Sequence, residues 1–258
     1  MYQIIYTISV NSSLKKEWDI FQCEDAGYVD LNIEINSNVY EYGGIEVFSH
    51  MKYPLVFRAE NSLVSANADW SYVDVTLLDG KSDGLDSALS AIVMTHLSTR
   101  NGLLVHASFV DYQGKGILFI GPSGIGKTTQ AELWAKYKNA TIINGDMALV
   151  HYENSKYYGY GCPWHGSSTY CENRKAELYG IIVLEQALEN HIERLTGITM
   201  VDRVMRNVFL PKWYEEGVNA ALCTVDGLLS TVPVYLLKCR IDEQAVELVE
   251  RVLFKKNV

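Results

Sequence analysis

The chain has 258 residues, of which 48% are hydrophobic and 21% are charged, and its formal net charge is −9 with a pI near 5.2. This length suits one large domain or a core that carries a smaller lobe, and the charged fraction is typical of folded proteins rather than disordered ones. A net negative surface repels polyanions over long range, so nucleic acid and anionic membranes are not expected as partners.

No targeting or membrane-spanning segment is apparent in the sequence. Its first residues lack a basic stretch followed by an apolar run and a cleavage site, and no apolar run approaches the roughly 20 residues that cross a bilayer. The five cysteines include no C-x-x-C pair, which argues against a disulfide framework and against a zinc site. We therefore expect a cytoplasmic protein without membrane association; its oligomeric state is left open.

The first 82 residues predict a β-rich N-terminal subdomain. Apolar and polar residues alternate there in short runs that are typical of strands, at 2–10, 29–35, 54–59 and 70–78. No catalytic pattern appears among them. These short alternating runs end after residue 82, and we expect residues 83–258 to form the core that carries the function.

The core part predicts helices and strands in alternation. A helical pattern from about 86 to 97 is followed by two apolar runs, 103–110 and 116–120, whose short polar joint favours an antiparallel hairpin. Further helices are expected at 128–138, 198–209, 213–229 and from 242 to about 255, and strands at 140–143, 180–184 and 234–239 with a strand pair over 148–160. These elements predict an α/β fold in which helices flank a mixed sheet.

Residues 121–128 match the pattern G-x-x-x-x-G-K-[ST], which is specific for a phosphate-binding loop, or P-loop. Its glycines let the backbone N–H groups converge on phosphate oxygens, and the helix that follows adds its positive N-terminal end. Lys127 is expected to reach the β- and γ-phosphates, and the Thr128 hydroxyl to join the shell of a Mg²⁺ ion. ATP is expected to contact Gly121, Pro122, Ser123, Gly124, Ile125, Gly126, Lys127, Thr128 and Thr129.

A P-loop enzyme also needs an acidic residue beside the metal, and two candidates follow predicted strands. Asp146 lies one helix and one strand beyond the loop, so we expect its strand to neighbour the loop and its carboxylate to hold Mg²⁺ or act as a base. Glu185 follows the apolar run 181–184, like the strand-plus-glutamate of motor-type ATPases. Asp146 is favoured, and Glu185 stays as the alternative.

Two classes of nucleotide enzyme are disfavoured by missing motifs. The sequence has no Asn-Lys-x-Asp run of the kind that reads guanine, and no His-Arg-Asp catalytic loop of the eukaryotic protein kinases. The absence of the first argues against a GTPase, although the choice between ATP and GTP stays open.

His106 lies on the first strand of the hairpin that leads into the loop. With the P-loop and Asp146, it resembles the HPr kinase/phosphorylase and phosphoenolpyruvate carboxykinase superfamily, in which a histidine-bearing strand turns into the strand that feeds the P-loop. The resemblance covers about residues 100–240 and is closest to the HPr-kinase-like proteins found beside peptide-modifying genes, including lasso peptide kinases. The segments 161–166 and 184–187 are similar to ones in that subgroup as well.

The resemblance implies a kinase that uses ATP and Mg²⁺ to phosphorylate a serine or threonine hydroxyl of a peptide or small protein. Asp146 would take the hydroxyl proton or hold the metal, Lys127 would neutralise the moving phosphoryl group, and His106 would orient or protonate it. The aspartate pair of the superfamily is here Gly145-Asp146, so one acid is missing. The arginine set of the carboxykinases is not recognisable, and decarboxylation is therefore not expected.

Residues 157–168 combine glycines, a proline and aromatic side chains, a composition that predicts a shaped loop. Trp164 and His165 are the leading candidates for contacts with substrate or adenine, and the nearby Arg174 is a candidate partner for a phosphate or a peptide carboxylate. The same pattern also fits a hairpin tip whose tyrosines pack on the core, beside a solvated arginine.

Three alternatives to a peptide kinase remain open. The chain could be a regulatory ATP-binding module without catalysis, a kinase of a small-molecule alcohol, or an ATPase motor that uses Glu185. The first differs from the leading hypothesis because it transfers no phosphate. The second differs in the molecule that accepts the phosphate.

Overall fold

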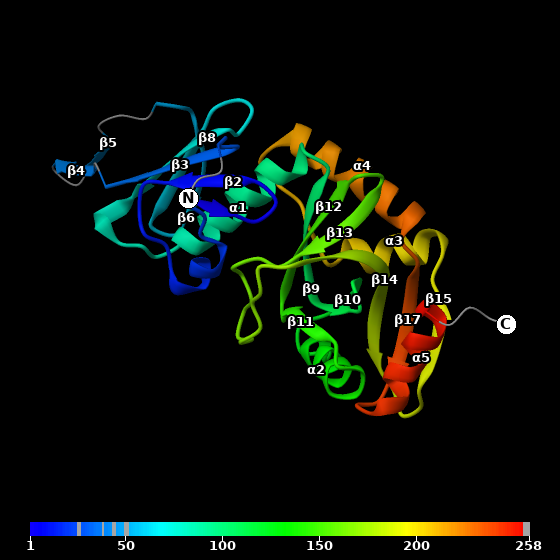
Figure 1. Ribbon diagram of the computed structural model, residues 1–258. Coiled ribbons are helices and arrows are strands. Elements are labelled where there is room, and N and C mark those ends of the chain that lie inside the picture. Colours follow the sequence, from blue (N-terminus) through cyan, green and yellow to red (C-terminus); the bar gives the residue numbers. More distant parts are fainter. Residues whose placement is uncertain (25–26, 38, 43–44, 49–51, 255–258) are drawn as a thin grey trace. The chain divides into compact units, whose positions relative to one another are not determined.

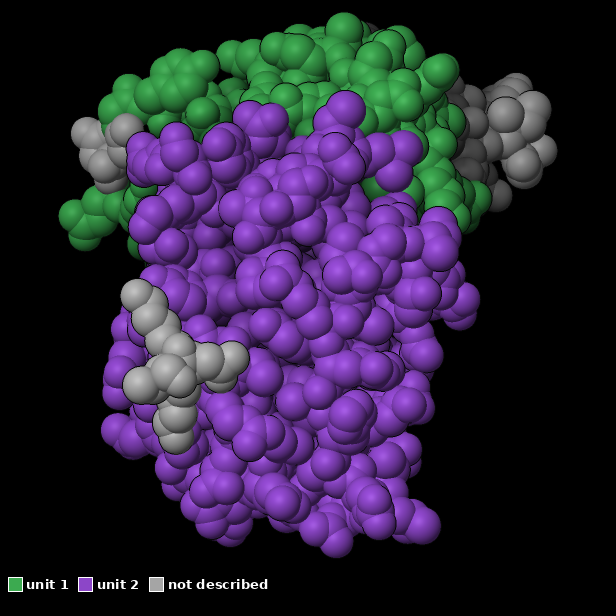
Figure 2. Space-filling view, turned by 90° about the vertical axis from the view of Figure 1, so that its right-hand side faces the viewer, with its two compact units in different colours: residues 1–100, 210–220 green, residues 101–209, 221–258 purple. Residues whose placement is uncertain are grey.

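A computed structural model describes residues 1–24, 27–37, 39–42, 45–48 and 52–254 (Figure 1). The chain separates into two compact units, residues 1–100 with 210–220 and residues 101–209 with 221–258, which Figure 2 distinguishes by colour. The fold is mixed α/β, with helices beside mixed sheets and a β-rich N-terminal part, as the sequence predicts. Within the described ranges, every helix is too short or too polar to span a bilayer.

Unit 1 is built mainly of strands. Its elements are β1 (Tyr2–Gln3), β2 (Thr7–Val10), β3 (Leu31–Asn36), β4 (Val39–Tyr42), β5 (Ile45–Phe48), β6 (Leu55–Ala59), β7 (Ser62–Ala66), β8 (Tyr72–Leu77) and helix α1 (Leu85–Ser98), with 3₁₀ helices at Lys16–Phe21 and Leu78–Gly80. The main sheet has the order β1-β2-β3-β8-β7-β6, and β4 pairs with β5.

The strands predicted at 29–35, 54–59 and 70–78 are confirmed to within a few residues as β3, β6 and β8. The run at 2–10 forms two short antiparallel strands, β1 and β2, instead of one. β7 was not predicted, because all five of its residues are buried and their sequence lacks the alternation of a half-exposed strand.

Helix α1 belongs to unit 1, where it packs on β6, β7 and β8. The sequence analysis assigned its residues to the second part of the chain, because the helical pattern begins just after residue 82. The alternation of apolar and polar residues thus ends near residue 82 because the strands of unit 1 are followed there by this helix. A domain division at that residue stays a prediction.

His96 of α1 predicts an acid-sensitive step in stability. Its ring is 1% exposed, its Nδ1 lies 2.9 Å from the Trp70 carbonyl oxygen, and burial lowers its pKa from 6.5 to about 4. Between these pH values the unfolded chain binds a proton at His96 that the folded chain does not. The contribution of His96 to the free energy of unfolding is therefore fully present above pH 6.5 and is lost as the pH drops.

We expect this residue to lower the free energy of unfolding by about 3 kcal/mol between pH 6.5 and 4. Denaturant titrations at several pH values should show a flatter acid dependence in His96→Gln than in the wild type. An identical slope in both proteins would assign the acid loss to other groups.

Unit 2 carries the phosphate loop. Its elements are β9 (Gly102–Tyr112), β10 (Lys115–Ile120), α2 (Lys127–Lys138), β11 (Thr141–Asn144), β12 (Met147–Glu153), β13 (Lys156–Tyr160), β14 (Lys175–Gln186), β15 (His191–Arg194), α3 (Gly197–Met205), β16 (Val208–Phe209), most of α4 (Glu215–Thr231), β17 (Val234–Cys239) and α5 (Glu243–Phe254). The strand order is β10-β9-β12-β13-β14-β17-β15, and β11 and β16 also pair with β9.

The predicted hairpin is confirmed, since β9 and β10 pair antiparallel around Gln113-Gly114, both with positive φ. β10 also pairs in parallel with β14, so the pairings of β9, β12, β13, β14 and β10 close a ring. Phe109 is fully buried within it, and a Cβ at Gly116 or Gly159 would lie 2.8 or 2.5 Å from its ring. These two glycines therefore make room for the aromatic side chain.

A hydrophobic core lies beneath the loop, where α2 and α5 pack together and against the sheet. Trp134 of α2 is fully buried, and its ring centre lies 6.5 Å from that of Phe119 on β10. The strand predicted at 234–239 and the final helix are confirmed, and the Asp242 carboxylate accepts the Ala245 N–H at 3.1 Å as a helix cap. Lys255, the predicted end of this helix, lies outside the described residues.

The helix predicted at 198–209 ends earlier than expected. α3 stops at Met205, and Val208–Phe209 form β16, which pairs with β9. The Asn207 N–H donates to the Val204 carbonyl in a tight last turn, so the chain leaves the helix and pairs with β9 beyond the end of β10.

Candidate active site

The phosphate loop connects the end of β10 to the start of α2, as the sequence predicts. Gly121, Gly124 and Gly126 have φ values of 149°, 77° and 109°, which side chains other than hydrogen rarely allow. The Ile125 N–H donates to the Pro122 carbonyl at 3.2 Å and closes the turn. The glycines of the motif therefore occupy the positions at which the backbone requires them.

The N-terminal end of α2 has no side-chain cap. Gly126 is its N-cap residue and, having no side chain, offers no capping acceptor to the first amides of the helix. The first turn of a helix presents N–H groups without an intrahelical partner, together with a partial positive charge. This end of α2 is therefore suited to an anion such as phosphate.

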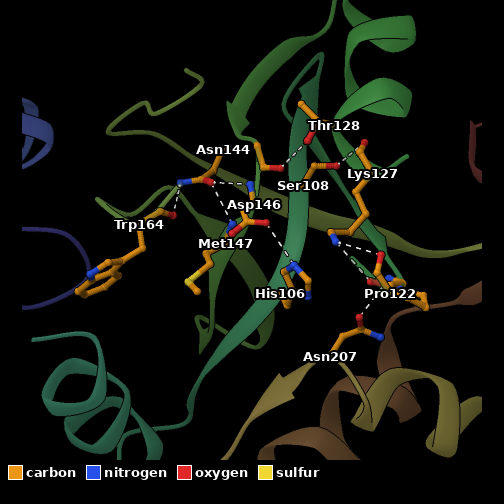
Figure 3. Close-up of polar contacts among 12 residues, drawn as sticks. His106, Ser108, Pro122, Lys127, Thr128, Asn144, Asp146, Met147, Trp164 and Asn207 are labelled. Carbon is orange, nitrogen blue, oxygen red and sulfur yellow. Dashed lines mark hydrogen bonds and ion pairs between the residues drawn. The ribbon is translucent and has the colours of Figure 1, made fainter. Parts of the chain in front are cut away.

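Lys127 is 6% exposed, and its ammonium group lies within the curve of the loop (Figure 3). Its Nζ donates to the carbonyl oxygens of Gly121 and Pro122 over 3.3 and 3.5 Å, which are long bonds. Burial lowers the pKa of Lys127, while the negative charge of Asp146 acts in the opposite direction. The buried Ser108 hydroxyl donates to the Lys127 carbonyl at 2.7 Å and fixes the backbone at the start of α2.

Asp146 and His106 form a hydrogen-bonded pair, with Nε2 of the histidine 3.2 Å from Oδ1 of the carboxylate. The His106 hydrogen bond, aided by the positive charges of His106, Lys127 and His165, lowers the pKa of Asp146. The two side chains are 25% and 31% exposed, so both can meet an incoming group. The structure thus brings together the three residues predicted to be catalytic.

The strand that ends before Asp146 reaches the loop by an indirect route. β11 pairs with β9 and not with β10, so β9 separates it from the strand that feeds the loop. Contact is made instead through Thr128, whose hydroxyl donates to the Gly145 carbonyl at 3.0 Å. Because Met147 lies opposite His106 in the β9–β12 register, the histidine comes next to Asp146.

Asn144, which the sequence analysis did not identify, holds this turn in place. Its side chain is fully buried, and its Oδ1 accepts the N–H groups of Asp146 and Met147, each at 3.0 Å. Its Nδ2 donates to the carbonyl oxygens of Cys162 and Trp164 at 2.8 and 3.2 Å. One amide therefore joins the carboxylate turn to the aromatic loop (Figure 3).

We expect Asn144→Ala to lower both stability and activity. The substitution leaves two N–H groups without their partner and removes one of the donors of each of two carbonyls, which should cost about 3 kcal/mol in the free energy of unfolding. Denaturant titration measures this loss, and Asn219→Ala, at an exposed position of α4, is the matched control. A loss below about 1 kcal/mol would show that the turn is held by other contacts.

Gly145 stands where the resemblance would place a second acid, and the structure supplies a physical reason for its lack of a side chain. A Cβ at this position would lie 1.9 Å from the Ser168 hydroxyl and 2.4 Å from the Ser168 Cβ. The aromatic loop therefore occupies the space of that side chain. Of the pair Gly145-Asp146, only Asp146 carries a carboxylate.

The predicted aromatic loop lies beside Asp146. A Cβ on Gly166 would lie 2.7 Å from Oδ2 of Asp146, and His165 Nδ1 contacts the Ser168 carbonyl oxygen. His165 is thus close enough for its charge to act on Asp146. The Trp164 backbone faces Asn144, and its indole ring points away from the His106–Asp146 pair (Figure 3).

Arg174 and Glu185 have ionic partners in the structure. Arg174 pairs with Asp111 at 3.2 Å, near the hairpin turn and at the opposite end of β9 and β10 from the loop. The structure does not bring it together with the catalytic candidates, and its substrate role stays a prediction. Glu185, at the end of β14, pairs with Arg203 of α3 at 3.4 Å.

A cavity of about 700 Å³ opens beside the first half of the loop, and α3 and the turn that follows it contribute residues that the sequence analysis missed. Asn207 accepts the Gly121 N–H at 3.1 Å through Oδ1, and its carbonyl accepts the His106 N–H at 2.8 Å. Arg203 and Arg206 line the same cavity. Nothing local in the sequence marks these residues, because they reach the loop from about 80 residues further along the chain.

The residues present fit a nucleotide with magnesium. Thr128 and Asp146 supply a hydroxyl and a carboxylate oxygen, which are the ligand types that Mg²⁺ prefers beside substrate phosphates. No group of three or more His, Cys, Asp or Glu side chains that could hold a metal occurs in the described part of the chain. A metal here would therefore need phosphate or water oxygens as additional ligands.

Comparison with known proteins gives one family and a distant structural likeness. The model of the family described as "SynChlorMet cassette protein ScmC" matches residues 84–255. A solved structure of the Hpr(Ser) kinase/phosphatase from Coxiella burnetii is 15% identical in sequence; the match covers 58% of this chain and 94% of that chain, with a TM-score of 0.35. No curated protein matches the chain.

Proposed function

The chain belongs to the family of the SynChlorMet cassette protein ScmC, and we propose that it is a cytoplasmic ATP-dependent kinase that phosphorylates a serine or threonine hydroxyl of a peptide or small protein. One observation carries the proposal. The Asp146 carboxylate, bonded to His106, lies within the electrostatic influence of Lys127 at a phosphate loop whose helix end is uncapped. A phosphate-binding group and a base are thus adjacent.

The loop binds the triphosphate in this proposal. The uncapped amides of α2 donate to phosphate oxygens, and the Lys127 ammonium exchanges its two long carbonyl contacts for charged oxygens. Hydrogen bonds between charged partners are shorter and stronger than those to neutral carbonyls. The buried lysine therefore gains more from phosphate than from the loop backbone.

Asp146 acts as the base. Its lowered pKa keeps it ionised at neutral pH, so it can accept the proton of the acceptor hydroxyl. The hydroxyl oxygen forms a bond to the γ-phosphorus, the bond from that phosphorus to the β–γ bridging oxygen breaks, and ADP leaves with the bond electrons. His106 holds the carboxylate through Nε2, and the proton passes from Asp146 to solvent.

Thr128 and Asp146 are the residues that would hold Mg²⁺. A magnesium ion neutralises charge on the β- and γ-phosphates during transfer. The Thr128 hydroxyl donates its hydrogen to the Gly145 carbonyl at 3.0 Å, which leaves the lone pairs of its oxygen for the ion.

The acceptor is proposed to approach through the 700 Å³ cavity that His106 lines. Arg203 and Arg206 lie in it with side chains 40% and 71% exposed, paired to Glu185 and Asp202. Exposed ion pairs of this kind exchange partners at little cost. The cavity therefore suits an acceptor that carries negative charge near its hydroxyl. A peptide acceptor rests on the resemblance alone, and a small-molecule alcohol needs the same chemistry.

A second function, a regulatory ATP-binding module without transfer, is favoured by one observation. Ser168 fills the place of the side chain that Gly145 lacks, so the site offers one carboxylate for two tasks, metal binding and proton transfer. If Asp146 serves only the metal, the site binds ATP without phosphorylating an acceptor.

A transfer assay separates the two functions. The wild-type protein is incubated with γ-labelled ATP, Mg²⁺ and a degenerate peptide library in which serine or threonine is fixed, with a parallel set of small alcohols. Label in a peptide supports the proposal. Label in an alcohol alone would change the substrate class from a peptide to a small-molecule alcohol. Binding of ATP with no labelled product in either set would leave the regulatory module as the function.

A further inference from the structure

A second cavity, of about 350 Å³, lies beside the other half of the phosphate loop. The first three residues of the loop line the cavity that contains His106, whereas Gly124, Ile125 and Gly126 line this one. Its remaining walls come from the first turn of α2, from the last residues of β14 and β17, and from the residues that directly follow these strands. The two cavities therefore open on opposite halves of one loop.

Gln130, in the first turn of α2, supplies an observation that points to a ligand. Its side chain lines the second cavity, is 3% exposed, and donates from Nε2 to the Cys239 sulfur at 3.3 Å. Its Oε1 has no hydrogen-bond partner among the described residues. A flipped amide would leave Nε2 unpaired in place of Oε1, so one polar atom lacks a partner in either orientation. A buried polar atom of this kind is satisfied when a ligand fills the cavity.

The lining is more apolar than polar, which suits the flat face of a ligand, and the charged Glu185 and Arg240 also reach the cavity. Leu184, Ala187 and Ile125 contribute apolar surface, and Ile241 lies at the rim with 72% of its surface exposed. Burial raises the pKa of the Cys239 thiol to about 11, so that group is uncharged at neutral pH. Ligand pockets of this size are typically apolar with a few polar groups that fix orientation.

The position of the cavity along the loop identifies its occupant. The Lys127 ammonium group lies at the carbonyls of Gly121 and Pro122, which line the first cavity. In the proposed function, the γ-phosphate therefore lies on this side of the loop, near Asp146. The lysine of a P-loop reaches the β- and γ-phosphates while the backbone holds the α- and β-phosphates, so the nucleoside leaves the loop at its other end. That end opens on Gln130 and Thr129.

We propose that the second cavity binds the nucleoside half of ATP, with the base against Ile241 and its exocyclic amino group donating to Gln130 Oε1. This inference rests on the proposed nucleotide binding at the loop. It assigns adenine to a place other than Trp164, whose ring points away from the His106–Asp146 pair (Figure 3).

Titration calorimetry with Mg·ATP and Mg·tripolyphosphate tests the inference, because the second ligand has the phosphates without a nucleoside. The wild type should bind ATP at least about tenfold more tightly than tripolyphosphate. Ile241→Ser and Gln130→Leu should each weaken ATP binding by about tenfold and leave tripolyphosphate affinity within twofold. Ile241 is exposed, so its variant should fold even if the change at the buried Gln130 disturbs α2.

Leu188→Ser is the matched control, since Leu188 is 90% exposed and does not line the cavity. Equal affinity of the wild type for the two ligands would overturn the inference and leave phosphate binding at the loop intact. Loss of the ATP preference in Trp164→Ala, with Ile241→Ser unchanged, would also overturn it. If the wild type binds neither ligand, the proposed function fails, and the nucleoside site fails with it.

Discussion

Lys127→Met should lower the rate of phosphate transfer by about a thousandfold, one of the two largest effects expected of a single substitution. The ammonium group is the one cationic side chain within the curve of the loop among the described residues, and it neutralises charge that grows on the phosphoryl group during transfer. Single-turnover transfer to the best acceptor measures the loss. Lys136→Met, an exposed lysine on the same helix, is the control and should retain full activity.

The same variant should keep its stability or gain some. Burial lowers the pKa of Lys127, which means that the charged form is held in an unfavourable setting in the folded protein. A methionine of similar length removes this charge from the interior. A large fall in the midpoint of thermal unfolding would show that Lys127 is needed for the fold, and transfer would then have to be compared at matched folded fractions. Transfer within tenfold of wild type would contradict its catalytic role.

Asp146→Asn should lower the transfer rate by about 10²- to 10⁴-fold while the affinity for ATP changes little. The amide keeps the shape of the side chain, a contact to His106 and an oxygen that can hold Mg²⁺, but it cannot accept the acceptor proton. Separate measurement of ATP binding and of single-turnover transfer distinguishes a lost base from a lost metal ligand, because loss of the metal would weaken binding as well. Asp111→Asn, at the far end of β9, is the control.

The pH dependence gives an independent readout of the same pair. The His106 hydrogen bond lowers the pKa of Asp146, so the carboxylate form persists at neutral pH and is lost only as the pH falls below the ordinary value of 3.8. His106→Asn weakens this hydrogen bond, so the pKa of Asp146 should rise and the acidic loss of transfer should move to higher pH. An unchanged acidic limb would indicate that Asp146 is not the group that titrates.

The fold of unit 2 could be predicted where its signal is local. The loop, the β9–β10 hairpin, β17 and α5 are each specified by residues adjacent in the chain, namely glycines, a short polar joint, an apolar run and the Asp242 cap. The parallel pairing of β10 with β14 joins segments separated by some 60 residues and leaves no local pattern. The closed ring around Phe109 was therefore not foreseen.

The residues of the candidate site also separate into those that could be predicted from the sequence and those that could not. His106, Lys127 and Asp146 were identified from a motif and a resemblance, and the structure places them together, although their roles stay predictions. Asn144 and Asn207 were missed, because an asparagine that satisfies buried backbone groups looks in sequence like an asparagine in a turn. Arg174 was singled out for its position after an aromatic loop, whereas its partner Asp111 lies on another strand.

The central claim is that a triphosphate binds at the loop that begins at Gly121. Calorimetric titration of the wild-type protein with Mg·ATP tests it most directly. The account predicts saturable binding of one ATP per chain, with a Kd below about 1 mM, and its loss in Lys127→Met but not in Lys136→Met. An absence of heat and of any thermal stabilisation at millimolar Mg·ATP would contradict the account.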